Sequence, residues 1–370
     1  PFLFGGQTDI QQRSIDEGWL TRDPNLNRPY TQNVQRNLRG QALVEPIDGM
    51  RINVSFSRRR SRNTSRTFRY FPDRGVFDTA NPPRTSGSYS TSFFSLPTAF
   101  IGERSNGISP VFQQFEANRR TIAERLSQSG VIDPETQFPK GYAGTSQEVL
   151  IPAFIAAYSG QDASDVGLSP FPDFPAPNWR RNYNGLSELE LIEDAVSNIS
   201  LNHSYQSTYS VNNFSTELRY NPNATVNNLE NGENFNPEFE IPQITINESL
   251  SPLIGIDITW ENDWTTRLEF GKTRQLSFRT TNNRLTEVVS NTFTIGAGYR
   301  TQEFVVPFRI DGERVVLDNE LNFRFDFRIR DNKTTIRRLD KPTPEPVSGQ
   351  TSIEVKPNVN YQINDNLRLR

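Results

Sequence analysis

Strict alternation of apolar and polar residues is the dominant pattern in the second half of the chain. The clearest example has large apolar residues at every second position and polar or charged residues between them. The apolar positions are Leu321, Phe323, Phe325, Phe327 and Ile329, and the intervening positions are Asn322, Arg324, Asp326, Arg328 and Arg330. A period of two places the two sets on opposite faces of a β-strand. We therefore predict a strand with one apolar and one polar face.

The same alternation recurs in neighbouring segments and predicts antiparallel hairpins. One apolar face consists of Ile254, Ile256 and Ile258, on a strand that ends at Trp260; residues 261–263 form a turn, and a return strand starts at Trp264. Further alternating runs cover residues 289–299, which end at Tyr299, and residues 353–363. Several of these runs reach the roughly 9–11 residues of a tilted transmembrane strand.

The pattern divides the chain into four parts. Residues 1–50 are polar and rich in turn signals, which indicates a connecting segment. Residues 51–100 are predicted to form strands, with an arginine-rich turn at 58–66. Residues 101–195 are predicted to form a helical and proline-rich insertion. Residues 196–370 are predicted to form strands to the end, where alternation in mid-segment indicates that the last strands of a longer protein are missing.

Helical spacing and capping signals define the insertion. Ser109 can cap a helix that has Pro110 at its first position, and the following apolar residues fall on one helical face. A second helix is predicted from residue 148 to 157. Ser187 and Glu190 form a capping-box pair for a third helix. Residues 170–177 contain a proline at every second or third position, which predicts an extended connection.

Composition decides how this alternation is interpreted. Apolar residues make up 34% of the chain and the mean hydropathy is −0.65, values that look too polar for a membrane protein. A transmembrane β-barrel, however, needs apolar residues at only every second position of each strand. The longest apolar run, residues 149–158, is about half the length of a membrane-spanning helix. We therefore predict an all-β transmembrane fold.

In such a fold the two faces have different surroundings. The lipid-facing residues would be Ile254, Ile256, Ile258, Leu321, Phe323, Phe325, Phe327 and Ile329. The lumen-facing residues would be Asn322, Arg324, Asp326, Arg328 and Arg330. The strand-end residues Trp260, Trp264 and Tyr299 are typical of the aromatic girdle at the lipid headgroups.

One segment conflicts with this assignment. Lys272 and Arg274 have the same parity as Phe270 and Leu276, which would direct two cations at lipid. Either Gly271 marks a bulge that reverses the face, or this part of the strand projects beyond the membrane.

Residues that carry chemistry are scarce. The chain has no cysteine, and His203 is its only histidine, so neither a thiolate site nor a pair of imidazoles is available. The acidic clusters fall at a predicted turn and at a predicted helix start, where solvated acids are common. We therefore expect no catalytic residues, cofactor or metal, and no enzyme activity.

The arginine-rich run at 58–66 allows two interpretations. It could bind the phosphates of nucleic acid or lipopolysaccharide. The whole chain has 40 basic and 43 acidic residues, so it lacks the basic excess of a nucleic-acid-binding protein. A solvated turn or an electropositive lumen patch is therefore favoured, and no nucleic-acid partner is expected.

Specific segments spread over most of the chain resemble the SprA (Sov) family, the outer-membrane translocon of the type IX secretion system. These segments are Leu26–Tyr30, Gly40–Gly49, Ser109–Glu116, Gly141–Ser146, Pro175–Trp179 and Trp260–Trp264.

The resemblance implies a single-chain outer-membrane barrel of about 36 strands, at the top of the known size range. It also implies a pore for folded cargo proteins that carry C-terminal secretion signals. A smaller barrel, PorV, would dock at a lateral opening, and a plug protein would close the periplasmic end. This chain would correspond to a region near the family's C-terminus with perhaps eight to twelve strands. No family motif marks catalytic residues.

Two other functions remain open at this stage. A plugged nutrient-uptake receptor would require an energy-coupling motif and a globular plug, and the sequence shows neither. A surface adhesin or motility protein would use the same alternation in a soluble β-sandwich.

Overall fold

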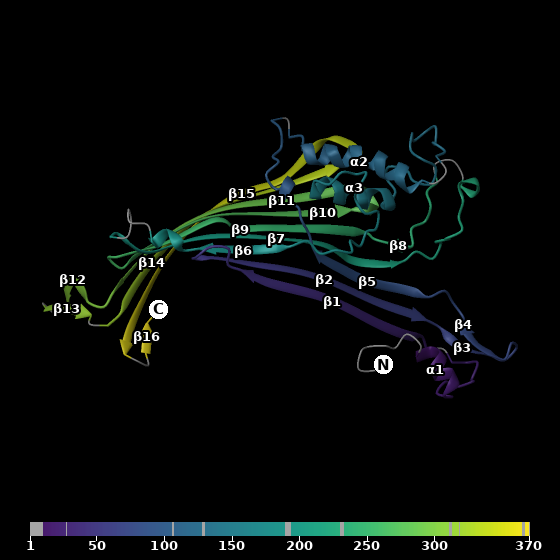
Figure 1. The fold of residues 1–370 in the computed structure, drawn as a ribbon, viewed down its shortest axis with the longest axis horizontal. Coiled ribbons are helices and arrows are strands. Elements are labelled where there is room, and N and C mark those ends of the chain that lie inside the picture. Colours follow the sequence, from purple (N-terminus) through teal and green to yellow (C-terminus); the bar gives the residue numbers. More distant parts are fainter. Residues whose placement is uncertain are drawn as a thin grey trace.

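The structure is a computed structural model that describes residues 10–26, 28–105, 107–127, 130–188, 194–229, 233–310, 313–317, 319–364 and 367–369. One large antiparallel sheet dominates it (Figure 1). The order of strands along this sheet is β1 (Tyr30–Val44), β2 (Met50–Arg66), β5 (Arg84–Ser92), β7 (Val196–Thr216), β9 (Gln243–Trp260), β10 (Trp264–Arg279), β11 (Arg284–Thr301), β14 (Leu321–Arg338), β15 (Lys341–Asn364) and β16 (Leu367–Leu369).

Shorter elements complete the fold. In the large sheet, β6 (Asn178–Tyr183) pairs with β2 and β7, and β8 (Phe239–Glu240) pairs with β7. The separate hairpins are β3 (Phe68–Phe71) with β4 (Val76–Thr79), and β12 (Phe304–Ile310) with β13 (Glu313–Leu317). The helices are α1 (Ile10–Asp16), α2 (Pro110–Leu126) and α3 (Gln147–Ser159), and the 3₁₀ turns are η2 (Leu96–Thr98), η3 (Gly185–Glu188), η4 (Val226–Asn228) and η5 (Thr280–Asn282). In the described part of the chain, no helix has both the length and the apolar character needed to cross a membrane.

Register aligns the alternating residues of neighbouring strands. Phe325 of β14 lies opposite Ala297 of β11 and Pro357 of β15. Directly opposed residues of an antiparallel pair point to the same side of the sheet, so each face keeps one character from strand to strand. The fold is thus mostly antiparallel β-sheet, as the alternation predicts.

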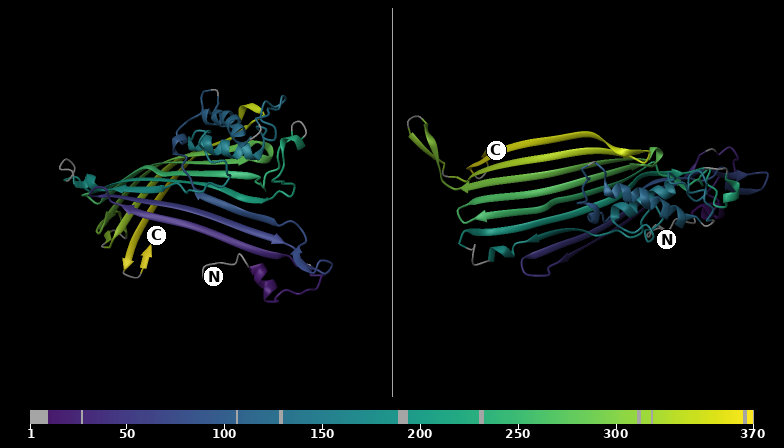
Figure 2. Two further views of the ribbon diagram at one scale, coloured as in Figure 1. Left: turned by 45° about the vertical axis from the view of Figure 1, so that its right-hand side comes forward. Right: turned by 90° about the horizontal axis from the view of Figure 1, so that it is seen from above.

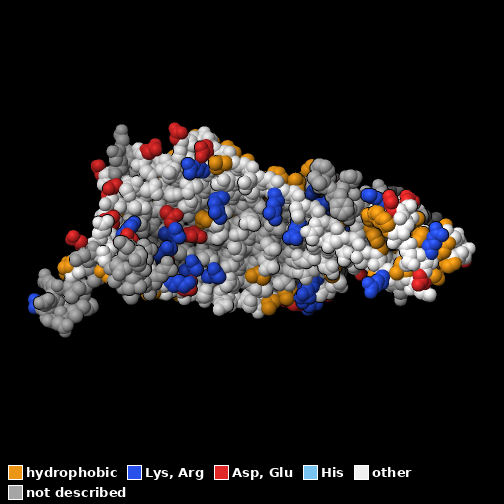
Figure 3. All heavy atoms as spheres, turned by 90° about the horizontal axis from the view of Figure 1, so that it is seen from below, with side chains coloured by type: hydrophobic (Ala, Val, Ile, Leu, Met, Phe, Trp, Pro, Cys, Tyr) orange, Lys and Arg blue, Asp and Glu red, His pale blue; other side chains and the backbone are white. Residues whose placement is uncertain are grey.

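The helices α2 and α3 lie on one face of this sheet (Figure 2). They cover one half of the strand length and leave the other half bare. The face turned away from them carries scattered charged side chains and few hydrophobic ones (Figure 3). The sheet is therefore a single layer over much of its length, with a helical layer on part of one side.

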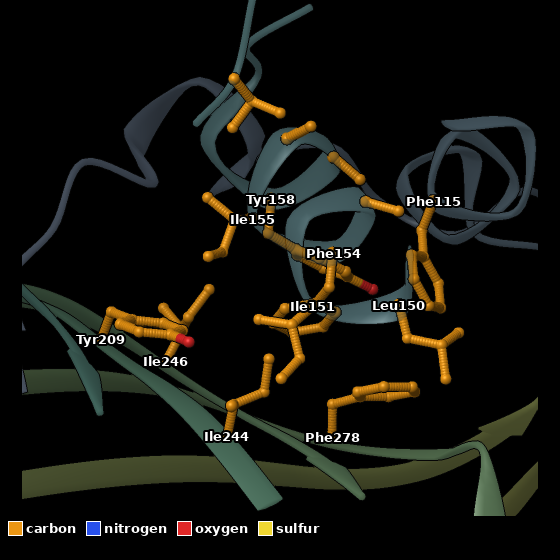
Figure 4. Packing of buried hydrophobic residues seen from close by; sticks show 14 of the residues in the cluster. Phe115, Leu150, Ile151, Phe154, Ile155, Tyr158, Tyr209, Ile244, Ile246 and Phe278 are labelled. Atoms are coloured by element: carbon orange, nitrogen blue, oxygen red, sulfur yellow. The ribbon is translucent and has the colours of Figure 1, made fainter. Parts of the chain in front are cut away.

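Aromatic packing joins the helices to the sheet. Ser109 accepts a hydrogen bond from the Phe112 amide and so caps α2 as predicted. The ring of Phe154 in α3 packs 5.8 Å from that of Phe115 in α2 and 5.4 Å from that of Phe278 in β10, and the latter two are 5.3 Å apart, measured between centroids (Figure 4). All three side chains are fully buried. This contact holds the helical layer on the half of the sheet that contains Phe278.

Three predicted segments differ in the structure. Residues 30–44 belong to the part predicted as a turn-rich connection, but they form β1 because the long β2 strand offers its edge along their whole length. Residues 58–66 were predicted as a turn and instead continue β2, where they pair with β1 and β5. The predicted insertion also contains a sheet strand, β6.

The predicted third helix can be followed only at its start. Residues 185–188 form the 3₁₀ turn η3, in which Ser187 Oγ donates a hydrogen bond to the Asn184 carbonyl, 2.8 Å away. Glu190, the other half of the capping-box pair, lies outside the described residues.

Candidate functional site

The most unusual surface of the molecule is an exposed apolar area on the bare half of the helix-bearing face. Ile254, Phe325 and Ile353 are 59%, 48% and 66% exposed there. We call this surface the apolar band. It consists of Leu38, Ala42 and Val44 of β1; Ile52, Val54 and Phe56 of β2; Ile199 and Leu201 of β7; Ile254, Ile256 and Ile258 of β9; Leu268 and Phe270 of β10; Phe293 and Ile295 of β11; Phe323, Phe325, Phe327 and Ile329 of β14; and Ile353, Val355 and Val359 of β15.

The opposite face is polar and crossed by ion pairs between side chains. Arg324 and Asp326 are 2.8 Å apart, and Arg328 lies 3.3 Å from Glu354 on the next strand. Asn322 and Arg330 have the same parity on β14 and so belong to this face. Thus the residues predicted to face lipid and those predicted to face a lumen lie on opposite sides of one sheet.

Aromatic residues mark the end of the band farther from the helices. Trp264 and Tyr299 are opposed across β10 and β11, and their ring centroids are 5.1 Å apart. Trp260 Nε1 donates a hydrogen bond to Thr266 Oγ1, 3.0 Å away. The three residues predicted as an aromatic girdle therefore lie together at one edge of the band.

A second aromatic row lies at the other edge of the band, and sequence reasoning missed it. The rings of Trp179 and Tyr205 are 4.5 Å apart, and Phe94 packs 6.0 Å from Tyr205. Phe100, from the same loop as Phe94, packs beside Lys272 of β10. These residues come from β6, β7 and the loop after β5, so no local spacing could have indicated their proximity.

The structure tests one of the two explanations for Lys272 and Arg274, the bulge at Gly271; that this part of the strand projects beyond the membrane stays a prediction. Pairing between β10 and β11 continues without interruption through Gly271, so the face is not reversed on β10. The irregularity lies in β9, between Leu250 and Ile254. Lys272 and Arg274 therefore share a face with Phe270, and the bulge explanation is wrong.

The change from apolar to polar occurs at the same level on several strands. The helix-bearing face passes from Phe270 to Lys272 on β10, from Phe293 to Asn291 on β11 and from Ile329 to Asp331 on β14. We call this line the border of the apolar band. Beyond it lie the helices.

The loop between β5 and α2 runs along this border. We call residues 93–103 the border segment. Its Ser95 amide donates to the Tyr205 hydroxyl on β7, 2.8 Å away, and the Ser95 hydroxyl donates to Glu248 on β9. Its Glu103 forms ion pairs with Arg337 and Lys333 on β14. The border segment thus crosses the sheet from β7 to β14.

A buried ion pair lies beneath the centre of the border segment. Arg274 Nη2 is 3.2 Å from Glu248 Oε2, and the two side chains are 4% and 1% exposed. Arg274 also donates to the Thr98 carbonyl at 2.8 Å and to the Thr98 hydroxyl at 2.9 Å. These bonds replace part of the hydration that the two charges lose, and they connect the sheet to the border segment.

Three arginines of β2 pack against the insertion and β8. Arg60 lies 4.9 Å from the centroid of the Phe171 ring, and Arg62 lies 5.8 Å from that of Phe239. Arg58 bonds to the Asp173 carbonyl. The prediction of a solvated turn is wrong, because the three side chains lie on a strand and pack on the helix-bearing face. The alternative of an electropositive lumen patch stays a prediction.

Chemical reactivity remains sparse among the side chains. In the described part of the chain, no group of three or more histidine, cysteine, aspartate or glutamate side chains could hold a metal ion. His203 Nδ1 lies 2.7 Å from the Leu253 carbonyl, and the imidazole packs near Trp179. The expectation of a non-enzymatic protein stays a prediction.

Known proteins do not identify the chain. No protein-family model matches it, and neither does any curated protein. The similarity to the SprA family therefore rests on the segments quoted above and stays a prediction.

A titration at α3 is expected to make the insertion less stable at high pH. Burial raises the pKa of Glu148, and one of its carboxylate oxygens is buried without a hydrogen-bond partner in the described part of the chain. The folded state therefore binds this proton more tightly than the unfolded state, whose pKa is about 4.3. Stability is highest below the unfolded pKa and falls as the pH rises through the raised folded pKa.

Glu148→Gln should weaken this pH dependence and stabilise α3 at pH 7. Hydrogen exchange of the α3 amides between pH 4 and pH 8, corrected for intrinsic rates, would measure the effect. Glu124→Gln on the exposed side of α2 is the matched control. The prediction is wrong if both variants behave alike.

Proposed function

We propose that this chain is part of the wall of a large outer-membrane β-barrel that conducts proteins. The observation that carries the proposal is the apolar band, which is continuous from β7 through β9, β10, β11 and β14 to β15 and has a polar, ion-paired face directly behind it. Lipid on one side and a water-filled lumen on the other would solvate these two faces. Aromatic rows at both edges of the band agree with the two membrane interfaces.

The exposure of the band argues against a soluble β-sandwich. Burying a Leu, Ile or Phe side chain stabilises a protein by about 1.5–3 kcal/mol, and a sandwich would gain this by packing a second sheet on the band. In the described residues the additional sheets are two-stranded hairpins, and Ile254 and Ile353 stay largely exposed. Contact with hydrocarbon would remove these side chains from water instead.

The edges of the sheet support a longer wall. Among the described residues, β1 pairs only with β2, so its other edge offers free backbone groups along Tyr30–Val44. Backbone groups in a bilayer must be paired, which closed barrels achieve. We infer that further strands continue the sheet toward a barrel of about 36 strands, the size that the resemblance implies.

The proposed activity is passive conduction by the type IX secretion translocon. The polar face would line the pore, where mixed charges limit adhesion of folded cargo of either sign. A PorV-like small barrel, a periplasmic plug protein and the secreted cargo are the partners implied by the resemblance. The proposed location is the outer membrane.

Comparison of secreted and periplasmic proteomes with and without the complete gene tests this function. We expect many proteins with C-terminal signals to disappear from the medium and accumulate in the periplasm. Unchanged secretion with loss of uptake of one nutrient would instead identify a receptor barrel. Release of the protein from membranes by urea would contradict the barrel itself and favour an adhesin or motility protein.

A further inference from the structure

The border segment keeps three large apolar side chains partly exposed at the edge of the apolar band. Phe94, Phe100 and Ile101 are 39%, 55% and 47% exposed. Large apolar residues in a solvated loop are commonly scattered, but these three gather beside a much larger apolar surface. They continue that surface onto the insertion.

Other residues of the border segment are buried against the sheet and anchor it there. Ala99 is buried against Tyr205 and Leu250, and Ser95 and Thr98 are buried in the network around the Glu248–Arg274 ion pair. The position of the neighbouring apolar residues is therefore set by a backbone that is anchored to the sheet.

The chemistry around Phe100 matches that of a lipid headgroup region. Lys272 Nζ lies 5.1 Å from the centroid of the Phe100 ring. Lys272 is the first residue of β10 beyond Phe270 on the helix-bearing face, so its ammonium group marks the level at which the apolar band ends. Aromatic rings and long cationic side chains are both favoured at this depth, where the ring contacts acyl chains and the ammonium group reaches phosphate.

We propose that the border segment seats the helical insertion on the membrane surface, outside the channel, with Phe94, Phe100 and Ile101 in the boundary between headgroups and acyl chains. The inference rests on the proposed function, because it takes the apolar band as the lipid-facing surface. The insertion then covers the outer side of the wall beyond the bilayer. The pore-lining face of these strands stays free of it.

Site-directed spin labelling of the complete protein in vesicles of phosphatidylethanolamine and phosphatidylglycerol tests the inference. The chain has no cysteine, so single-cysteine variants place the label at one position in it. Phe100→Cys is the test position. Ile254→Cys in the apolar band is the lipid control, and Phe174→Cys, 91% exposed on the insertion, is the aqueous control. Accessibility to oxygen and to a water-soluble nickel complex reports the depth of each label.

We expect the label at 100 to lose accessibility to the nickel complex when detergent is replaced by lipid, as the label at 254 does, while the label at 174 keeps it. Aqueous behaviour at 100 together with lipid exposure at 254 would overturn this inference and leave the proposed function intact. Aqueous behaviour at both positions would overturn the proposed function as well. Ile101→Cys serves as a second test position if the variant at 100 does not fold.

Discussion

Replacing Arg274 by alanine will destabilise the attachment of the helical insertion to the sheet by about 3–5 kcal/mol. The guanidinium is buried together with Glu248 and donates two hydrogen bonds to Thr98 of the border segment. Its removal leaves the Glu248 carboxylate buried without its cation and removes both bonds to the border segment. The loss should appear as local opening of the helices, because the strands keep their backbone pairing.

Hydrogen exchange of the α3 amides measures this effect, and we expect it to accelerate by about a hundredfold or more. Arg267→Ala is the matched control on the same strand, because its ion pair with Asp257 is exposed on the opposite face and is worth below about 1 kcal/mol. The double replacement Arg274→Met with Glu248→Leu should restore most of the protection, since it leaves no unpaired charge. Unchanged exchange in Arg274→Ala would show that this pair does not hold the insertion.

Placing a charge at Phe325 should destabilise the barrel by about 2–4 kcal/mol if this residue sits near the bilayer midplane. Phe325 lies within the part of β14 that belongs to the apolar band and is 48% exposed there. Phe325→Arg would place a guanidinium in hydrocarbon, opposite Ala297 and Pro357, which offer it no counter-ion. The expected effect depends on lipid, so it should shrink in a detergent that lets water reach the site.

Asp326→Arg is the control for the same strand and depth. Asp326 lies on the polar face and is paired with the half-exposed Arg324, so the reversal of its charge should have a mild effect, about 1 kcal/mol or less. Urea titration of the complete protein in vesicles gives both free energies of unfolding. Equal losses at the two positions would count against the assignment of β14's two faces.

Local sequence determined the strands and their two-sided character. The residues of β14 alternate so strictly that the period of two alone separates Phe325 from Asp326, and the same holds for Ile256 and Asp257 on β9. The helix start at Ser109 was also predictable, since a capping residue and a following proline act within one turn. In each case the determining interactions lie within a few residues along the chain.

Only the tertiary structure decided how these elements share surfaces. The residues of β1 alternate weakly and become a strand because β2 provides backbone partners along their whole length. Lys272 and Arg274 lie on the same face as Phe270, as their parity predicts. Parity could not predict their neighbours, because these come from the border segment, which is remote in sequence: Phe100 lies beside Lys272, and Thr98 accepts a hydrogen bond from Arg274. Periodicity reports the side of a strand on which a residue lies, whereas what covers that side depends on contacts between distant segments.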